Sequence, residues 1–197
     1  MLIYSVKGNR AHTENNKTQK ETTTVPKKKI NPRCIPLSKA EFNKDAIIEE
    51  AMSGTLANAW LLVASALYEQ GYRNIDKLNE KISAYVDSVG GKADMKRAEE
   101  LMGMPTTTRF NHGRISSPYD LEKYKQKVAW VAIRTSLGVI CLGLEDTGEF
   151  TEEEIRRVFL NVDLSLAEIE RGMKSYEQIE RELLNRMVQE EMENAPS

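Results

Sequence analysis

LANAWLLVASALYEQ, residues 56–70, is the stretch that decides the fold of this 197-residue chain. Between Leu56 and Leu67 it holds ten apolar residues, which would cover every side of a helix. A helix that is apolar all round is normally buried in a protein core. We therefore expect this segment to form a central helix that other helices surround.

A second apolar segment, VAWVAIRTSLGVICLGL, follows at residues 128–144. It is at the short limit for crossing about 30 Å of hydrocarbon, and Arg134 near its middle would be costly in lipid. We therefore interpret it as a second core helix and not as a membrane span. Its β-branched residues and Gly138 leave open that part of it is a buried strand. Within a core, Arg134 must reach the surface or pair with an acid.

Amphipathic helices are predicted between and before these two segments. Residues 75–89 place apolar side chains three and four positions apart, as one helical face requires. A shorter helix is predicted over residues 92–103, where a glycine ends it. Ser38 and Glu41 form a capping-box pattern that opens a first helix, which would run to about Ala51.

Capping signals also mark the beginning of the later helices. Ser117 and Pro118 suit a cap and a first helical position, so a helix is predicted to run from Tyr119 into residues 128–144. Thr151 and Glu154 match a second capping box, which opens a short helix through Phe159.

The chain is predicted to close with a long acidic amphipathic helix from Leu164 to about Met192. The stripe that we take as the candidate protein-interaction face comprises Ile169, Met173, Tyr176, Leu183 and Met187. This stripe could pack on the core or pair with a second copy of the chain. Its Met and Tyr residues favour core packing over a strict coiled coil.

Together these elements predict an all-α fold with five to seven helices. We expect a helical core domain over residues 37–162, followed over residues 163–197 by the long amphipathic helix and a short tail. Residues 1–36 are predicted to be a basic disordered arm. Residues 7–33 are polar throughout, so ordering them would cost backbone entropy with little apolar burial in return.

The net charge of −2 is unevenly placed along the chain. Residues 1–44 hold ten Lys and Arg against three Asp and Glu, a net charge of +7. Residues 145–197 hold six against fifteen, a net charge of −9. The asymmetry predicts that the front end prefers anionic partners such as nucleic acid. The alternative interpretation is that both ends are simply well solvated.

The sequence offers no complete catalytic or metal-binding set. VGGKAD matches a phosphate-binding loop only at GGK, and DTGEFTEEE lacks the ligand spacing of a calcium loop. The two histidines, His12 and His112, and the two cysteines, Cys34 and Cys141, stand in unrelated contexts, so we expect no zinc site. We therefore expect no enzyme activity, no metal and no cofactor. A site assembled from distant carboxylates remains the alternative.

Cysteine use and the first residues bear on location. The two cysteines are more than a hundred residues apart, which is typical of reduced thiols in the cytosol. The first residues lack the apolar run of a secretory signal. We therefore expect a cytoplasmic protein without membrane contact.

Basic residues in three places are candidates for nucleic-acid contact. Residues 75–103 and the loop at 106–118 could be arranged as helix, turn, recognition helix and wing, although any helical hairpin would look similar. The candidate nucleic-acid-binding residues are Lys27, Lys28, Lys29 and Arg33 in the arm, Lys96 and Arg97 in the short helix, and Arg109 and Arg114 in the loop. His112 is interpreted as an ordinary loop histidine.

Residues 45–103, with NAW and YEQGYRNIDKLNEKISAYVDSV, resemble small all-helical proteins of unknown function that are encoded by phages of Gram-positive bacteria. The resemblance covers about a third of the chain and carries over no functional residue. It implies a small accessory protein that acts by binding.

Two functional hypotheses follow from the sequence. The first is a non-enzymatic accessory or regulatory protein of a phage or mobile element, which contacts nucleic acid or a nucleic-acid-bound complex through the arm and the 106–118 loop. The second is a protein-binding inhibitor or assembly adaptor that acts through the acidic C-terminal helix and docks on a basic, nucleic-acid-binding protein.

Overall fold

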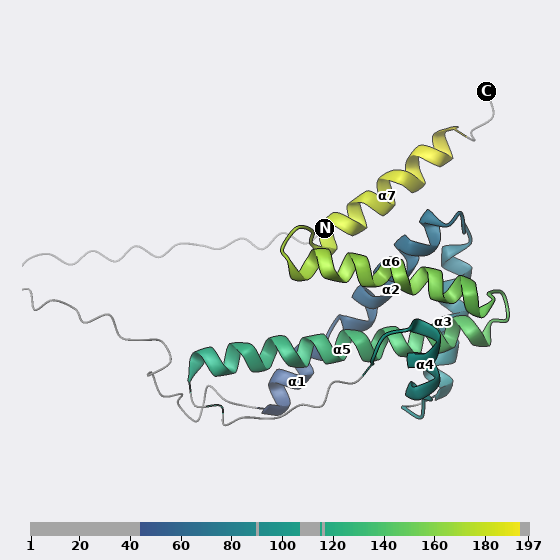
Figure 1. The fold of residues 1–197 in the computed structure, drawn as a ribbon. Helices are drawn as coiled ribbons and strands as arrows, with labels where there is room; N and C mark the ends of the chain where they lie inside the picture. Colours follow the sequence, from purple (N-terminus) through teal and green to yellow (C-terminus); the bar gives the residue numbers. More distant parts are fainter. Residues whose placement is uncertain (1–43, 90, 107–114, 116, 194–197) are drawn as a thin grey trace, which may run out of the picture. The chain divides into compact units, whose positions relative to one another are not determined.

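The computed structural model describes residues 44–89, 91–106, 115 and 117–193, all of which belong to one compact unit (Figure 1). This part of the chain forms seven α-helices and no strand, which confirms the predicted all-α class. The predicted disordered arm, residues 1–36, lies outside the described residues. The helices are α1 (Lys44–Met52), α2 (Thr55–Glu69), α3 (Ile75–Val89), α4 (Met95–Met102), α5 (Pro118–Asp146), α6 (Glu152–Glu170) and α7 (Tyr176–Glu193).

The two apolar segments form the centre of the fold, as predicted. Helix α2 packs on α5, and the remaining helices pack on one or both of these two. α1, α3 and α4 lie on α5, α7 lies on α2, and α6 contacts both (Figure 1). Leu62 and Leu67 of α2 share one continuous core with Leu137 and Leu144 of α5 and with Phe159 of α6. Residues 128–144 are helical throughout, so the alternative of a buried strand is wrong.

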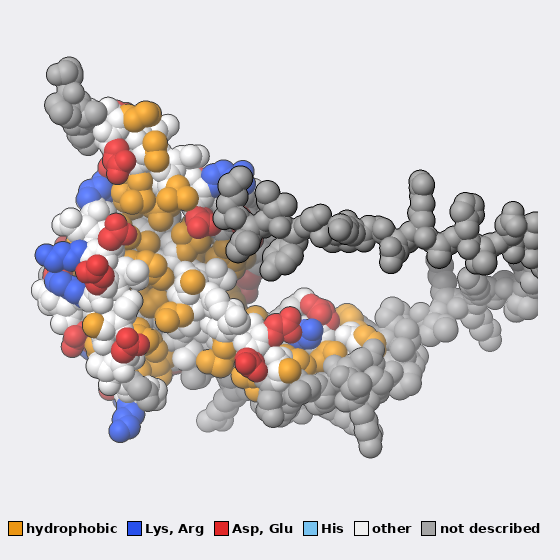
Figure 2. All heavy atoms as spheres, turned by 180° about the vertical axis from the view of Figure 1, so that it is seen from behind, with side chains coloured by type: hydrophobic (Ala, Val, Ile, Leu, Met, Phe, Trp, Pro, Cys, Tyr) orange, Lys and Arg blue, Asp and Glu red, His pale blue; other side chains and the backbone are white. Residues whose placement is uncertain are grey.

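The described helices leave the beginning of α2 open, whereas the sequence predicted a helix that other helices surround. From Ala59 to Tyr68 most of its residues are buried. At its beginning, however, Leu56 is 44% exposed, and Trp60 is only half-buried. Figure 2 shows the face opposite to that of Figure 1, where apolar side chains gather in a band across the described helices. Among the described helices, none covers the apolar surface of α2 at Leu56.

The predicted helix caps of α5 and α6 are confirmed. Ser117 Oγ accepts a hydrogen bond from the backbone N–H of Asp120 at 3.2 Å, and Pro118 is the first residue of α5. In α6, the Glu154 N–H donates to Thr151 Oγ1 at 3.3 Å, and the Thr151 N–H donates to Glu154 Oε2 at 2.8 Å. Each bond satisfies an N–H that the helix itself leaves unpaired.

The boundaries of two helices differ from the prediction. α4 begins at Met95 and not at residue 92, because Asp94 caps it and accepts from the Arg97 N–H at 3.2 Å. The first described residue, Lys44, already belongs to α1, and the predicted capping box at Ser38 lies outside the described residues. α6 continues to Glu170 without the predicted break after Phe159, because no glycine or proline interrupts residues 159–164.

The true break in the C-terminal half lies at Gly172. There the N–H of Met173 donates to the Glu168 carbonyl at 2.9 Å, and the N–H of Gly172 donates to the Ile169 carbonyl at 2.9 Å. This is a Schellman motif, and Gly172 has the positive φ (68°) that it requires. A capping box between Ser175 and Gln178 then opens α7. The predicted long helix from Leu164 is therefore two helices, of which α7 is the acidic C-terminal one.

By length and composition alone, Ala46–Glu69 and α5 could each cross a membrane. This is weak evidence, since the core helices of soluble proteins pass the same test. The first segment is interrupted by the turn at Gly54, and 41% of its apolar window is buried inside the protein. In α5 the buried share is 56%, and the same helix carries Arg134. We keep the interpretation of α5 as a core helix.

Gly138 allows α4 and the segment after it to approach α5 closely. A Cβ at this position would lie 2.5 Å from Met95 Cε and 2.9 Å from Thr106 Cγ2. Thr106 cannot withdraw easily, because its backbone N–H and its hydroxyl both donate to Glu99 Oε1 at 2.8 Å. The absence of a side chain at Gly138 thus keeps Thr106 buried against α5.

We expect Gly138→Ala to lower the free energy of unfolding by about 1–3 kcal/mol, because it overpacks this contact. Urea unfolding followed by circular dichroism measures the change. Gly143→Ala is the matched control in the same helix, where the new Cβ would come no closer than 3.3 Å to Ile82. There a gain in helix propensity of about 0.5–1 kcal/mol offsets the strain. Equal stability of the two variants would contradict the role given to Gly138.

Candidate binding surfaces

Helix α7 is held on α2 by one face only. Ile179 and Leu183 on this face are buried in the common core. Two ion pairs flank them: Arg186 Nη1 lies 2.8 Å from Glu69 Oε1, and Arg73 Nε lies 2.6 Å from Glu190 Oε2. Hydrogen bonds from Arg73 and from a tyrosine hydroxyl lower the pKa of the Glu190 carboxyl. Among the described helices, α7 makes its main packing contact with α2 alone.

The opposite face of α7 carries an apolar line inside an acidic helix. Leu184, Val188 and Met192 follow one another at four-residue spacing and are 53%, 53% and 67% exposed. Residues at this spacing lie on one side of a helix. α7 contains six Glu and two Arg, and Arg186 is already paired with a carboxylate of α2. We call Leu184, Val188 and Met192 with the surrounding glutamates the α7 outer face.

A groove of 950 Å³ lies between the beginning of α2, the first half of α5 and the end of α6. Its apolar part includes Trp130 and Ile133 of α5 and Ile169 of α6. Charged side chains of both signs, among them Lys127 and Glu170, also line it. This mixed charge gives the groove no preference for an acidic or a basic ligand, in contrast to the α7 outer face.

Arg134 pairs with an acid, which was one of the two arrangements expected for it. Its Nη2 lies 3.7 Å from Asp163 Oδ1 of α6, and its Nη1 donates to the Pro105 carbonyl at 3.1 Å. The guanidinium carbon stands 4.6 Å from the centre of the Trp130 ring. Its Nε is buried and has no hydrogen-bond partner among the described residues. Arg134 thus joins α5 to α6 and to the segment after α4, which is a structural role.

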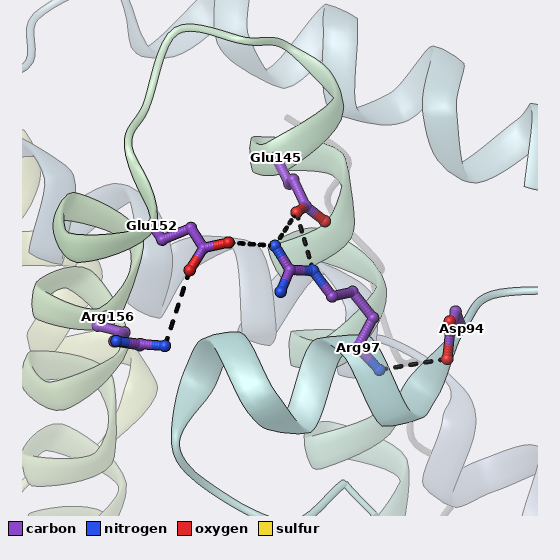
Figure 3. Close-up of polar contacts among 5 residues, drawn as sticks. All are labelled: Asp94, Arg97, Glu145, Glu152 and Arg156. Carbon is purple, nitrogen blue, oxygen red and sulfur yellow. Dashed lines mark hydrogen bonds and ion pairs between the residues drawn. The ribbon is translucent and has the colours of Figure 1, made fainter.

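Arg97 is engaged by carboxylates of this chain's own helices (Figure 3). Its Nε donates to Glu145 Oε1 at 2.9 Å, and its Nη2 lies 2.5 Å from both Glu145 Oε1 and Glu152 Oε1. Glu152 is also shared with Arg156 at 3.8 Å. These bonds raise the pKa of Arg97 and lower the pKa of the Glu152 carboxyl. The cluster ties α4 to α5 and α6.

The arrangement of α3 and α4 does not support a helix-turn-helix. Each of them packs on α5, and they are not a packed pair. A DNA-binding helix-turn-helix needs its two helices packed together, so that the first braces the recognition helix. Lys96 is exposed on α4, but it lies 4.0 Å from Glu100 on the same helix. The described part of the predicted nucleic-acid site is therefore not assembled as expected.

The remaining predicted nucleic-acid residues, Lys27, Lys28, Lys29, Arg33, Arg109 and Arg114, lie outside the described residues, as does His112. Of the predicted protein-interaction stripe, Leu183 is buried, and Ile169, Tyr176 and Met187 are half-buried against the core. Met173 is exposed in the turn between α6 and α7. The stripe therefore serves mainly to pack the two helices. The α7 outer face was missed, although its four-residue spacing is visible in the sequence.

Two features of the described residues bear on possible chemistry. They contain no group of three or more His, Cys, Asp or Glu that could hold a metal ion. Cys141 is buried in the core, and burial raises the pKa of its thiol to about 12. Because the thiolate is the reactive form, this cysteine is inert near neutral pH.

The fold and these surfaces define an all-α protein with exposed helix faces of distinct charge and apolarity. Comparisons of the chain with protein-family models, with curated proteins and with solved structures found no match.

The Arg97 cluster predicts an acid-dependent loss of stability. The folded-state pKa of Glu152 is lowered, first of all by its hydrogen bond to Arg97. A carboxyl with a lowered pKa stabilises the fold above its ordinary pKa, and that contribution is lost as pH falls through the folded-state value. We therefore expect the urea midpoint to fall on acidification below the ordinary carboxyl pKa, and to fall less in Arg97→Gln than in the unaltered chain.

Lys96→Gln is the control for that experiment, because it changes the neighbouring exposed charge and leaves the cluster intact. It should keep the pH dependence of the unaltered chain. The same pH dependence in Arg97→Gln and in the unaltered chain would contradict the coupling between Arg97 and Glu152.

Proposed function

We propose that this chain is a non-enzymatic accessory or regulatory protein that docks on a basic protein partner through the α7 outer face. The observation that carries the proposal is the line of Leu184, Val188 and Met192, exposed on a helix with six Glu and two Arg. Apolar residues at the centre of an interface supply most of its affinity, and the charged rim selects the partner. The partner that fits this pattern is a protein with an amphipathic helix that carries lysine or arginine beside its apolar face.

The charge of the described helices supports the same partner. The residues that the structure describes hold 17 Lys and Arg against 27 Asp and Glu, a net charge of −10. A field of this sign attracts basic proteins and speeds their association. A partner that uses its basic surface for nucleic acid would be occluded by such docking, which makes the chain an inhibitor or an assembly adaptor.

A labelled amphipathic peptide of leucine and lysine is the probe that tests this site. We expect fluorescence anisotropy to show binding by the full chain that weakens with salt. The double variant Leu184→Ser/Val188→Ser should weaken binding at least about tenfold, because burial of each apolar side chain contributes about 1.5–3 kcal/mol. Both residues are exposed, so the fold is retained.

Leu160→Ser/Leu164→Ser is the matched control, because these leucines of α6 are equally exposed and lie outside the α7 outer face. A peptide with glutamate in place of lysine controls for charge. The proposal is wrong if both peptides bind alike, or if the α6 variant weakens binding as much as the α7 variant.

A second candidate function is nucleic-acid contact, which the net charge of +7 over residues 1–44 favours. Because Arg97 is engaged within the protein, this contact would use the arm residues and the loop arginines Arg109 and Arg114. The resemblance of residues 45–103 to phage-encoded helical proteins supports an accessory role in a phage or mobile element. Such an accessory protein would act in the cytoplasm.

For this function, anisotropy of labelled DNA and RNA oligonucleotides across a salt series is the direct measurement. We expect binding by the full chain that falls steeply with salt, and its loss in a chain of residues 35–197 and in Arg109→Ala/Arg114→Ala. The Leu184→Ser/Val188→Ser variant should bind as the unaltered chain does. Absence of binding by the full chain at low salt would exclude this second function.

A further inference from the structure

A second exposed surface lies where α2 begins, apart from the α7 outer face. Met52 at the end of α1 is 61% exposed, and Leu56 in the first turn of α2 is also exposed. Leu56 also borders a hollow of 350 Å³ between α2 and α3. It is lined mainly by apolar side chains, namely Leu56, Ala57, Trp60, Ile82, Val86 and Ile140, with Asn79, Ser83 and Asp87 also bordering it. We call Leu56 and this hollow the α2–α3 patch.

This surface is unusual for a helix of such composition. The segment from Leu56 to Leu67 is apolar on all sides, and a helix of this kind is stable when it is covered on all sides. α5, α6 and α7 cover the rest of α2, whereas Leu56 remains exposed and Trp60 half-buried. Contiguous apolar surface rimmed by polar groups marks an interaction site.

We propose that a second copy of this chain covers the α2–α3 patch, so that the protein is a two-fold symmetric dimer. The first argument is charge: of the described residues that line the hollow, Asp87 alone is charged, although the described helices carry a net charge of −10. An apolar, charge-poor surface is typical of interfaces between copies of one chain, whereas transient partners meet on more polar surfaces.

The second argument is shape. A two-fold interface needs a protrusion and a recess on the same surface, so that each copy fills the other. The α2–α3 patch offers both, because the exposed side chain of Leu56 stands at the border of the hollow. A cavity of about 150 Å³ admits a benzene ring, so a hollow of 350 Å³ has room for the leucine side chain of a second copy.

The alternative is that the α2–α3 patch binds a lipid bilayer, because Ala46–Glu69 is apolar enough to contact one. Charge opposes it, because the described helices carry a net charge of −10. Anionic bilayers attract basic and not acidic surfaces. The proposed dimer shares no residue with the α7 outer face, so it stands independently of the proposed docking function.

Sedimentation velocity of the full chain over a wide concentration range tests the proposal. We expect the mass of a dimer, and a dissociation constant raised at least about tenfold by Leu56→Glu, since a central apolar contact is replaced by a buried charge. Ser83→Trp should have the same effect by filling the hollow from an exposed position. Circular dichroism checks that each variant is folded. If Leu56→Glu does not fold, Ser83→Trp still tests the interface.

Leu160→Glu, on an equally exposed leucine of α6, is the matched control and should leave the dimer intact. A chain that is monomeric at every concentration would overturn the proposal, as would a dimer that Leu160→Glu disrupts while Leu56→Glu and Ser83→Trp do not. Flotation with vesicles of phosphatidylcholine and phosphatidylserine tests the alternative that the patch binds lipid. Binding of a monomeric chain to these vesicles, lost in Leu56→Glu, would assign the patch to lipid and also overturn the dimer.

Discussion

The packing of α2 against α5 is the interaction on which the rest of the structure depends. Both helices are apolar over most of their length, and their burial supplies the main favourable contribution to folding. Each of the other described helices packs on α2, on α5 or on both, and this contact determines its position. Apart from α4 and α6, the other described helices make their main contacts with α2 or α5 and not with one another.

Ion pairs act at the periphery of this core and determine how the helix ends are arranged. Arg97 joins three helices through Glu145 and Glu152, and Glu149 joins the α5–α6 turn to Lys81 of α3 and to the Tyr72 hydroxyl. Pairs with this degree of exposure contribute little to stability individually. They have a larger effect on which ligands the surface can bind. An arginine that is paired with a carboxylate of its own chain is less available to an external anionic ligand.

Apolar periodicity and capping residues in the sequence were enough to predict the fold class and most helices. The caps at Ser117 and Thr151 depend on neighbours three residues away, which the sequence displays directly. The break at Gly172 was missed because the core-facing stripe continues from α6 into α7, so periodicity alone cannot reveal the turn. The partners of Arg97 are 48 and 55 residues distant, and no local pattern encodes them. The open side of α2 was missed for the same reason, since coverage depends on tertiary packing.

The Schellman turn at Gly172 has a consequence for dynamics. Because α7 is joined to α6 by this short turn and packs mainly on α2, it can separate from the core without unpacking α5. Proteins open in cooperative units whose free energies differ, and elements with few buried contacts open first. Among the described helices, α7 therefore has the lowest free energy of local opening. Its amide hydrogens should exchange with solvent before those of α2 and α5. A ligand that bridged α7 and α2 would suppress this opening, whereas one that held α7 alone would leave it free to occur.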